Sequence, residues 1–210
     1  MLKRKDTVSL SPSKLVDHFY NDIHFSTSAL IVLVVVFLDL LFSLILNVKD
    51  IGSLVLYEIF FVFVINWIIL GGILYILLYL IKGKSRMPEH AFEKVLSSLA
   101  SFRIPVIIAY LFLAVISLIF LPSFVGYLRE LFTNPALINS LTFSPQVSIL
   151  NIIGFILIAI LVIGLLVYWL MQLYHFTETV YGFKKVWQKL LMMIVIIVIS
   201  VLFSSIFSKQ

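Results

Sequence analysis

Five long apolar stretches, separated by short polar connections, dominate the chain. Each is close to the roughly 20 apolar residues needed to cross about 30 Å of hydrocarbon. Because hydrocarbon offers no partners to backbone N–H and C=O groups, each stretch is expected to be helical. The predicted spans are Ser28–Val48, Tyr57–Ile81, Ile104–Leu121, Val147–Tyr174 and Leu190–Phe207. The pattern therefore predicts an all-α integral membrane protein, with five transmembrane helices in one bundle over residues 28–207 and a cytoplasmic segment over residues 1–27.

Two of the polar segments carry an apolar stripe at helical spacing. Near the N-terminus, Ser11-Pro12 has the form of an N-cap followed by Pro at the first helical position. The stripe that follows it consists of Leu15, Val16, Phe19, Tyr20 and Ile23. In residues 89–103 the stripe consists of Phe92, Val95, Leu96 and Leu99, opposite His90, Glu93, Lys94, Ser97 and Ser98. Both patterns are typical of amphipathic helices that lie on a membrane surface.

Composition agrees with a membrane protein. Hydrophobic residues make up 62% of the chain and charged residues 12%, and the mean hydropathy is +1.18. A soluble domain is roughly half apolar and a quarter charged, so lipid is the expected solvent. The absence of Cys excludes disulfides, thiolate metal sites and Cys nucleophiles. The net charge of +5 is not gathered into one basic block, so nucleic acid is not an expected partner.

The distribution of Lys and Arg predicts the orientation. Of the 15 basic residues, all but three lie in the N-terminal segment and in the second and fourth connections. The three on the other side are Lys49, Arg129 and Lys209. Cytoplasmic loops carry the excess of Lys and Arg. The N-terminus is therefore expected in the cytoplasm and the C-terminus outside.

Asp39 is the one carboxylate well inside a predicted span. A charge there costs a few kcal/mol, so Asp39 should pair, face the bundle interior or be protonated. Asn66 and Asn151 are possible partners at a similar predicted depth. One hypothesis is a proton or cation site in a small transporter or channel subunit. The other is a structural hydrogen bond between helices, because coupled transporters usually contain more than one buried ionisable group. Similarly, Gly71, Gly72, Gly154 and Gly164 fit either close helix packing or a hinge.

Catalytic and metal-binding patterns are not found. The four His residues are scattered without i, i+4 pairs, and no HExxH, GxSxG or phosphate-binding Gly loop occurs. Only His175 and Glu178 lie together on the predicted cytoplasmic side, which leaves an enzyme acting on lipid as a remote alternative. We therefore expect a non-enzymatic protein without a metal or other cofactor.

The stretch Tyr168–Lys189 is predicted to form the cytoplasmic elbow between the last two spans. Its turn, Thr177–Lys185, has basic residues that would attract anionic lipid headgroups. Its aromatic residues fit a membrane-interface belt. Contact with a protein partner or a second copy of the chain is the more specific hypothesis. The candidate contact residues are Glu178, Gly182, Lys184, Lys185, Phe92 and Phe19.

Three segments carry a resemblance to a known family. They read SPSKLVDHFY near the N-terminus, LASFRIPVIIAYLFL into the third span, and YWLMQLYHFTETVYGFKKVWQKLL across the elbow. Together with the five-span layout, they resemble the short prokaryotic members of the Yip family, the Ypt-interacting protein domain, over nearly the whole chain. The Asp-Leu-Tyr-Gly-Pro type of motif found in eukaryotic members is absent. The resemblance implies a non-enzymatic integral membrane protein of a prokaryotic plasma membrane, and eukaryotic relatives act in vesicle trafficking and membrane shaping through protein contacts. Because the amphipathic and basic features lie on the predicted cytoplasmic side, we expect a scaffold or adaptor in membrane organisation or trafficking.

Overall fold

The computed structural model describes residues 10–45, 64, 66–120 and 149–207, and their regular secondary structure is entirely helical. This confirms the predicted all-α class. The described parts of the predicted spans fall on α2, α4, α6, α8 and α9, whereas the start of the second span, residues 57–63, lies outside the described residues. The elements are α1 (Pro12–Asn21), α2 (Phe25–Ile45), α4 (Asn66–Lys82), η3 (Lys84–Arg86), α5 (Ala91–Ser101), α6 (Arg103–Phe120), α8 (Ile149–Tyr181) and α9 (Val186–Phe207).

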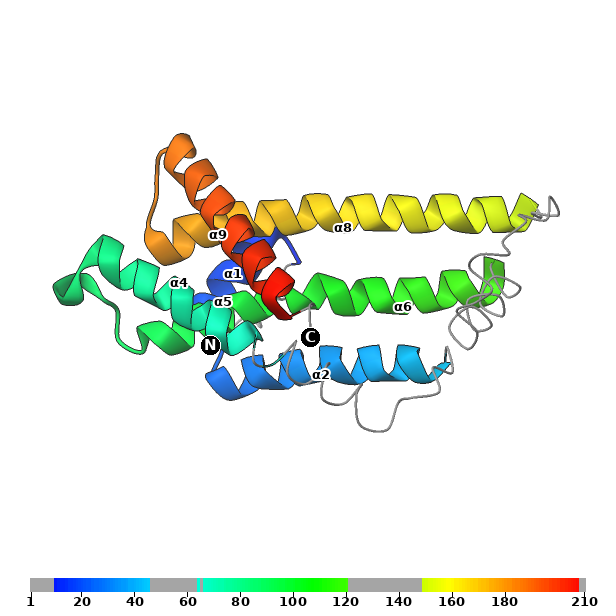
Figure 1. Ribbon diagram of the computed structural model, residues 1–210, viewed down its shortest axis with the longest axis horizontal. Helices are drawn as coiled ribbons and strands as arrows, with labels where there is room; N and C mark the ends of the chain where they lie inside the picture. Colours follow the sequence, from blue (N-terminus) through cyan, green and yellow to red (C-terminus); the bar gives the residue numbers. More distant parts are fainter. Residues whose placement is uncertain (1–9, 46–63, 65, 121–148, 208–210) are drawn as a thin grey trace, which may run out of the picture.

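Three long helices, α2, α6 and α8, lie side by side and give the molecule its length (Figure 1). The 33 residues of α8 extend about 50 Å at 1.5 Å per residue. Within the described part of the chain, two segments are long and apolar enough to cross a membrane, Ala91–Phe120 and α8. The first of these contains α5 and α6, which are separated only by Phe102.

The helices α4 and α9 are placed differently from the expected five-helix bundle. Both pack at the end where α8 finishes, and α9 runs diagonally across α8 (Figure 1). Two hydrogen bonds fix α4 there: Lys82 Nζ donates to the carbonyl of Val180 over 2.8 Å, and Tyr181 Oη donates to the carbonyl of Leu74 over 3.0 Å. We call the three long helices α2, α6 and α8 the arm. We call the region where α1, α4, α5 and α9 pack with the starts and ends of the arm helices the hub.

The hub is built around α5. Buried apolar side chains from α1, α2, α4, α8 and α9 join those of α5 in one cluster. The prediction that residues 89–103 lie on a membrane surface is wrong for the second half of α5, where Ser97 and Ser98 of the polar face are at most 1% exposed. At the start of the helix, His90 and Glu93 of the same face stay exposed. Small Ser side chains let neighbouring helices approach, and their hydroxyls can bond within their own helix. Ser98 Oγ donates to the carbonyl of Lys94 over 2.9 Å.

The helix α1 has the predicted amphipathic pattern, but its apolar face packs against protein rather than against a membrane surface. Its apolar residues Leu15, Val16 and Phe19 are buried in the hub rather than directed toward lipid. On the polar side, Thr179 Oγ1 of α8 donates to Asp17 Oδ1 over 2.5 Å. The N-terminal helix is therefore part of the hub.

Gly71 lies at a close contact between α4 and α5, against the side chain of Leu96. A Cβ atom at this position would lie 2.2 Å from Leu96 Cδ2 and 3.1 Å from Leu96 Cγ. The same addition at Gly72 or Gly164 would meet no atom within 4 Å. The close-packing interpretation is therefore supported for Gly71, and not for Gly72 or Gly164.

Candidate functional site

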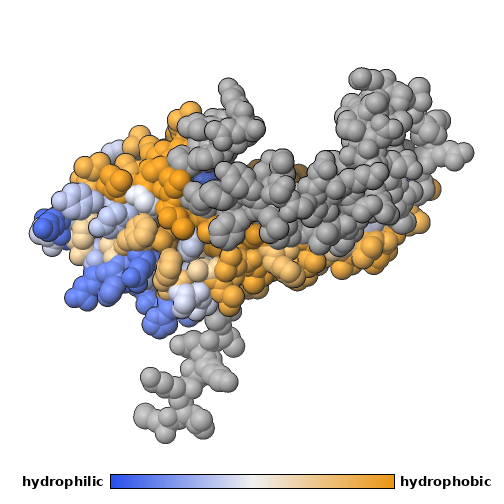
Figure 2. All heavy atoms as spheres, turned by 60° about the horizontal axis from the view of Figure 1, so that its bottom comes forward, coloured by the Kyte–Doolittle hydropathy of each residue, from blue (hydrophilic) through white to orange (hydrophobic). Residues whose placement is uncertain are grey.

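Charged residues gather at one end of the described molecule, here called the polar end. It consists of η3, the first turn of α5, the last turns of α8 and the turn 182–185. Figure 2 shows hydrophilic surface over one end and hydrophobic surface along much of the rest. The sequence-predicted elbow belongs to this end, which makes it the candidate functional site.

The elbow is shorter than the predicted turn Thr177–Lys185, because α8 continues to Tyr181. Gly182 ends the helix with φ of +75°, and its N–H donates to the carbonyl of Glu178 over 2.8 Å. A left-handed residue at this position is a common helix C-cap, and Gly adopts it without steric cost. Gly182 is thus required by the backbone at the turn, while Lys184 and Lys185 that follow it are exposed.

Glu178 forms an ion pair across the elbow with Lys189 in the first turn of α9. Lys189 Nζ lies 2.6 Å from Glu178 Oε2 and 4.4 Å from the centre of the Tyr174 ring, and Lys189 is only 5% exposed. The hydrogen bond from Lys189 lowers the pKa of Glu178, and it outweighs the partial burial that would raise that pKa. The same bond raises the pKa of Lys189. The pair therefore holds α8 and α9 in one relative position.

A second cation, Lys82, caps the end of α8. Its bond to the Val180 carbonyl satisfies one of the last C=O groups of the helix, where the helix dipole favours positive charge. Burial lowers the pKa of Lys82. Together with the Glu178–Lys189 pair, this bond fixes the elbow to both neighbouring helices. The sequence pattern indicates Lys82 and Lys189 only as orientation signals and contains no sign of either contact.

The predicted contact residues do not form one surface. Glu178, Gly182, Lys184 and Lys185 lie within one elbow, and all four are exposed. Phe92 is 39% exposed and packs edge-on against Tyr75 of α4. Phe19 is only 4% exposed and belongs to the hub core, so its predicted role in partner contact is wrong.

The predicted intramembrane polar residues are also not a single group. Asn151 lies in the first turn of α8. Asn66 of α4 lines a cavity together with Trp169, which lies about 27 Å further along α8 than Asn151 at 1.5 Å per residue. The expectation that these two residues share a depth is therefore wrong. Asp39 lies on α2, but its side chain is outside the described part of the structure.

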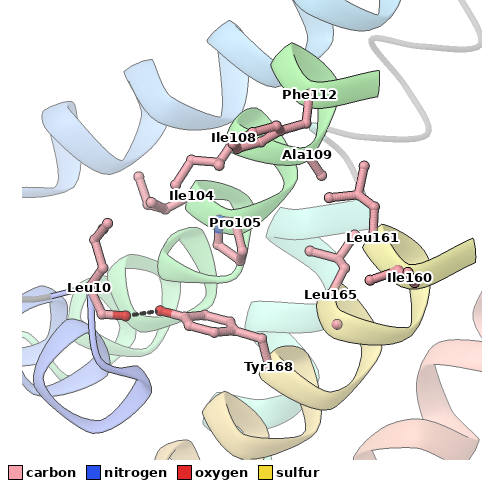
Figure 3. Close-up of a pocket in the computed structure, with 11 residues that line it drawn as sticks. Leu10, Ile104, Pro105, Ile108, Ala109, Phe112, Ile160, Leu161, Leu165 and Tyr168 are labelled. Atoms are coloured by element: carbon pink, nitrogen blue, oxygen red, sulfur yellow. Dashed lines mark hydrogen bonds between the residues drawn. The ribbon is translucent and has the colours of Figure 1, made fainter. Parts of the chain in front are cut away.

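Two cavities lie near the start of α6. One is an apolar groove of about 380 Å³ between α6 and α8, shown in Figure 3. Tyr168 lies at one end of this groove, and its hydroxyl donates to the carbonyl of Leu10. The other is a cavity of about 220 Å³. Arg103 lines it and is the only charged side chain among the described residues that line either cavity. Thus the groove offers almost only apolar contacts, whereas the second cavity combines apolar and polar groups.

The part of the chain that the structure describes contains no cluster of three or more His, Asp or Glu side chains that could hold a metal ion. The catalytic candidate expected from the sequence is the pair His175 and Glu178, whose Nδ1 and Oε2 atoms are 3.9 Å apart. This distance is too long for a hydrogen bond, and Glu178 Oε2 already accepts a bond from Lys189. The elbow geometry therefore favours a structural role for Glu178.

Comparison with known proteins adds no relative: no family model, curated protein or solved structure matches the chain. The resemblance to the Yip family stays a prediction that rests on the three sequence segments quoted above.

Proposed function

We propose that this chain is an integral membrane protein that acts as a non-enzymatic scaffold or adaptor through its polar end. Its N-terminus would lie in the cytoplasm and its C-terminus outside. One observation carries the proposal: the long helices have an apolar outer surface, and they end in an elbow that presents the exposed charges of Lys184 and Lys185. The resemblance to the Yip family implies a non-enzymatic integral membrane protein, which is consistent with this role.

The outer surface of the arm supports membrane insertion. Along α8, Ile160, Ile163 and Leu166 are each more than half exposed. Burying apolar surface stabilises a protein by roughly 25 cal/mol per Å², so a long helix with such a face is stable only where lipid or protein covers it. Several residues of α4 and α9 are equally exposed, including Leu80 and Ile194. This supports contact of all five apolar helices with lipid.

The helix directions support the predicted orientation. The helix α2 runs away from the polar end, α5 begins again at that end, and α8 returns to it (Figure 1). The chain between α2 and α5 must therefore come back to the polar end. This alternation fits the count of basic residues in the connections and a cytoplasmic position for Lys184 and Lys185.

The construction of the elbow supports binding rather than catalysis. Its backbone is held by the Gly182 cap, the Lys82 bond and the Glu178–Lys189 pair. These contacts leave Lys184 and Lys185 as exposed charges on a fixed turn. A rigid surface loses less conformational entropy when a partner binds, so the partner expected here is a protein with an acidic surface, or a second copy of the chain.

The absence of Cys allows a clean test of topology. Single Cys residues are introduced at Lys185 and at Ile149, and a membrane-impermeant thiol reagent is applied to intact cells and to inverted vesicles. Lys185→Cys should react only in inverted vesicles, and Ile149→Cys only from the outside. Labelling of both positions from the same side would contradict the proposed orientation.

Partner binding is tested by a photo-crosslinking amino acid at Lys185, with Ile163 on the arm as the control position. We expect a crosslinked protein of defined mass from Lys185 and none from Ile163. When the photo-crosslinking amino acid is placed at Phe92 instead, the Lys184→Glu, Lys185→Glu double substitution should lower the yield of crosslinked partner. Equal yields at Lys185 and Ile163 would indicate random collisions in the membrane and would contradict the adaptor role.

A further inference from the structure

The cavity around Arg103 is formed where the arm joins the hub, and we call it the Arg103 cavity. Five helices contribute to its wall: α4, α5, α6, α8 and α9. Its volume is about 220 Å³, below the roughly 300–1,000 Å³ of sites that enclose a drug-sized ligand. It can therefore hold a headgroup or the first part of a chain, but not a whole lipid.

The lining of the cavity favours an anion. Among the described residues that line it, Arg103 is the one charged side chain and none carries a carboxylate. A guanidinium carries five N–H donors in a planar fork, so it can bind a carboxylate or phosphate even while it makes other contacts. Asn66 and Ser200 add further hydrogen-bonding groups to the same wall. A cation would meet only repulsion from Arg103.

The rest of the wall favours an apolar group next to that anion. Trp67, Phe102 and Trp169 provide aromatic surface, and Leu70, Val106, Leu173 and Ile196 are among the aliphatic residues. The indole N–H of Trp67 already donates to the carbonyl of Leu96 over 3.0 Å, so this residue offers the cavity mainly its ring. A freely soluble anion would leave most of this wall without a suitable partner.

We propose that the Arg103 cavity binds the anionic group of a membrane amphiphile, a carboxylate or a phosphate carried on an acyl chain. The inference rests on the proposed function, because insertion in a membrane supplies the amphiphile. Arg103 holds the anion, Asn66 and Ser200 bond to it, and the aromatic wall contacts the beginning of the chain. Binding at this junction would fix α4 and α9 against the arm.

Intrinsic fluorescence provides a direct assay, because two of the three Trp residues, Trp67 and Trp169, line the cavity. Trp187 is exposed on α9 and is replaced by Phe to remove its signal. The Trp187→Phe protein in an uncharged detergent is titrated with a long-chain fatty acid, phosphatidic acid, phosphatidylcholine or inorganic phosphate. We expect a saturable change with the fatty acid, with phosphatidic acid or with both, and the response identifies the source of the anion.

Variants test the role of the charge. Arg103→Gln should weaken binding at least tenfold, because a hydrogen bond to a charged group is stronger than a neutral one. Arg86→Gln, the same substitution at an exposed site of the polar end, should change the affinity less than twofold. If Arg103→Gln does not fold, Ser200→Leu fills the cavity instead and should abolish the response.

Three results would overturn the proposal. The first is an equal loss of ligand affinity in Arg103→Gln and Arg86→Gln. The second is binding of phosphatidylcholine as tight as that of the anionic amphiphiles, and the third is binding of inorganic phosphate as tight as theirs. Extraction of native membranes with alkaline carbonate separates this inference from the proposed function. Release of the protein by carbonate contradicts membrane insertion, whereas a retained protein with a flat titration contradicts only the ligand site.

Discussion

At the scale of single residues, Lys189 has the most informative surroundings. It is an almost buried cation that contacts one carboxylate and one aromatic ring. Replacing its partner leaves that charge without a counterion, which is more costly than losing an exposed pair. Because Glu178 is about half exposed, water offsets part of the loss. We expect Glu178→Gln to lower the free energy of unfolding by about 1–2 kcal/mol.

The measurement is unfolding by a denaturing detergent, followed by circular dichroism, with Lys185→Gln as the control. Lys185 is exposed on the same turn, so its substitution should change the free energy of unfolding by less than about 0.5 kcal/mol. Equal effects of the two substitutions would show that the Glu178–Lys189 pair adds no stability.

The same pair predicts a pH dependence. The pKa of Glu178 is lowered in the folded protein, so its contribution is present above its ordinary pKa of 4.5 and is lost as the pH falls through the lower folded value. The pKa of Lys189 is raised, so its contribution is present below 10.5 and is lost as the pH rises through the higher folded value. The stability difference between wild type and Glu178→Gln should therefore be constant from about pH 6 to 9 and shrink below about pH 4. A difference that grows in acid would contradict the ion pair.

Sequence patterns identified the elbow but not the pairing within it. Glu178, Gly182, Lys184 and Lys185 were correctly grouped, because charged residues and Gly between two apolar stretches indicate a connection. The pairing of Glu178 with Lys189 depends on the path of the Gly182 turn and on the diagonal course of α9. Neither follows from charge counts. Phe19 was assigned to the surface because the apolar stripe shows that a helix is amphipathic, and not whether protein or lipid covers it.

At the scale of the elements, the contact between α4 and α5 depends on one Gly. Gly71→Ala would place a methyl group against Leu96, which is 1% exposed and has little room to move. Overpacking of this kind costs typically 1–3 kcal/mol. Gly72→Ala adds the same methyl group in open space and gains up to about 1 kcal/mol of helix propensity.

The free energy of unfolding should therefore fall in Gly71→Ala and stay the same or rise in Gly72→Ala. A Gly71→Ala, Leu96→Ala double variant should regain part of the stability that the clash removes, since Leu96→Ala takes away the atoms that clash with the new methyl group. Equal stability of the two single variants would show that α4 does not pack closely on α5.

The sequence predicts where the helices lie along the chain better than it predicts what packs around each of them. Apolar runs of membrane length predicted the described ends of α2 and α6 to within a few residues, whereas α8 continues past the predicted end at Tyr174 to Tyr181. The role of α5 was not predictable, because Ser97 and Ser98 count as polar in any periodicity argument. Their hydroxyl groups can bond backbone carbonyls of α5 itself, which lets a polar-looking face be buried.

At the scale of the whole molecule, the described packing is concentrated in the hub, and the arm presents much of its apolar surface outward. Sequence analysis predicted the order and direction of the long helices. It could not place α4 and α9, since their hydropathy is as high as that of the arm helices. Their position is set by specific contacts, such as Lys82 with Val180 and Gly71 with Leu96, which a hydropathy pattern does not contain.

The separation into hub and arm predicts that the same Leu→Ala substitution will lower stability more in the hub than on the arm. Leu96→Ala in the hub would remove a side chain that is 1% exposed, and such cavities cost about 2–5 kcal/mol. Leu166→Ala on the arm would remove a side chain that is 55% exposed, and it should cost less than about 0.5 kcal/mol, because lipid or detergent fills the space. Both variants are unfolded in the same denaturing detergent and compared at equal micelle composition. Similar losses at both positions would mean that the arm helices bury Leu166 against other protein, and that the separation into arm and hub does not hold.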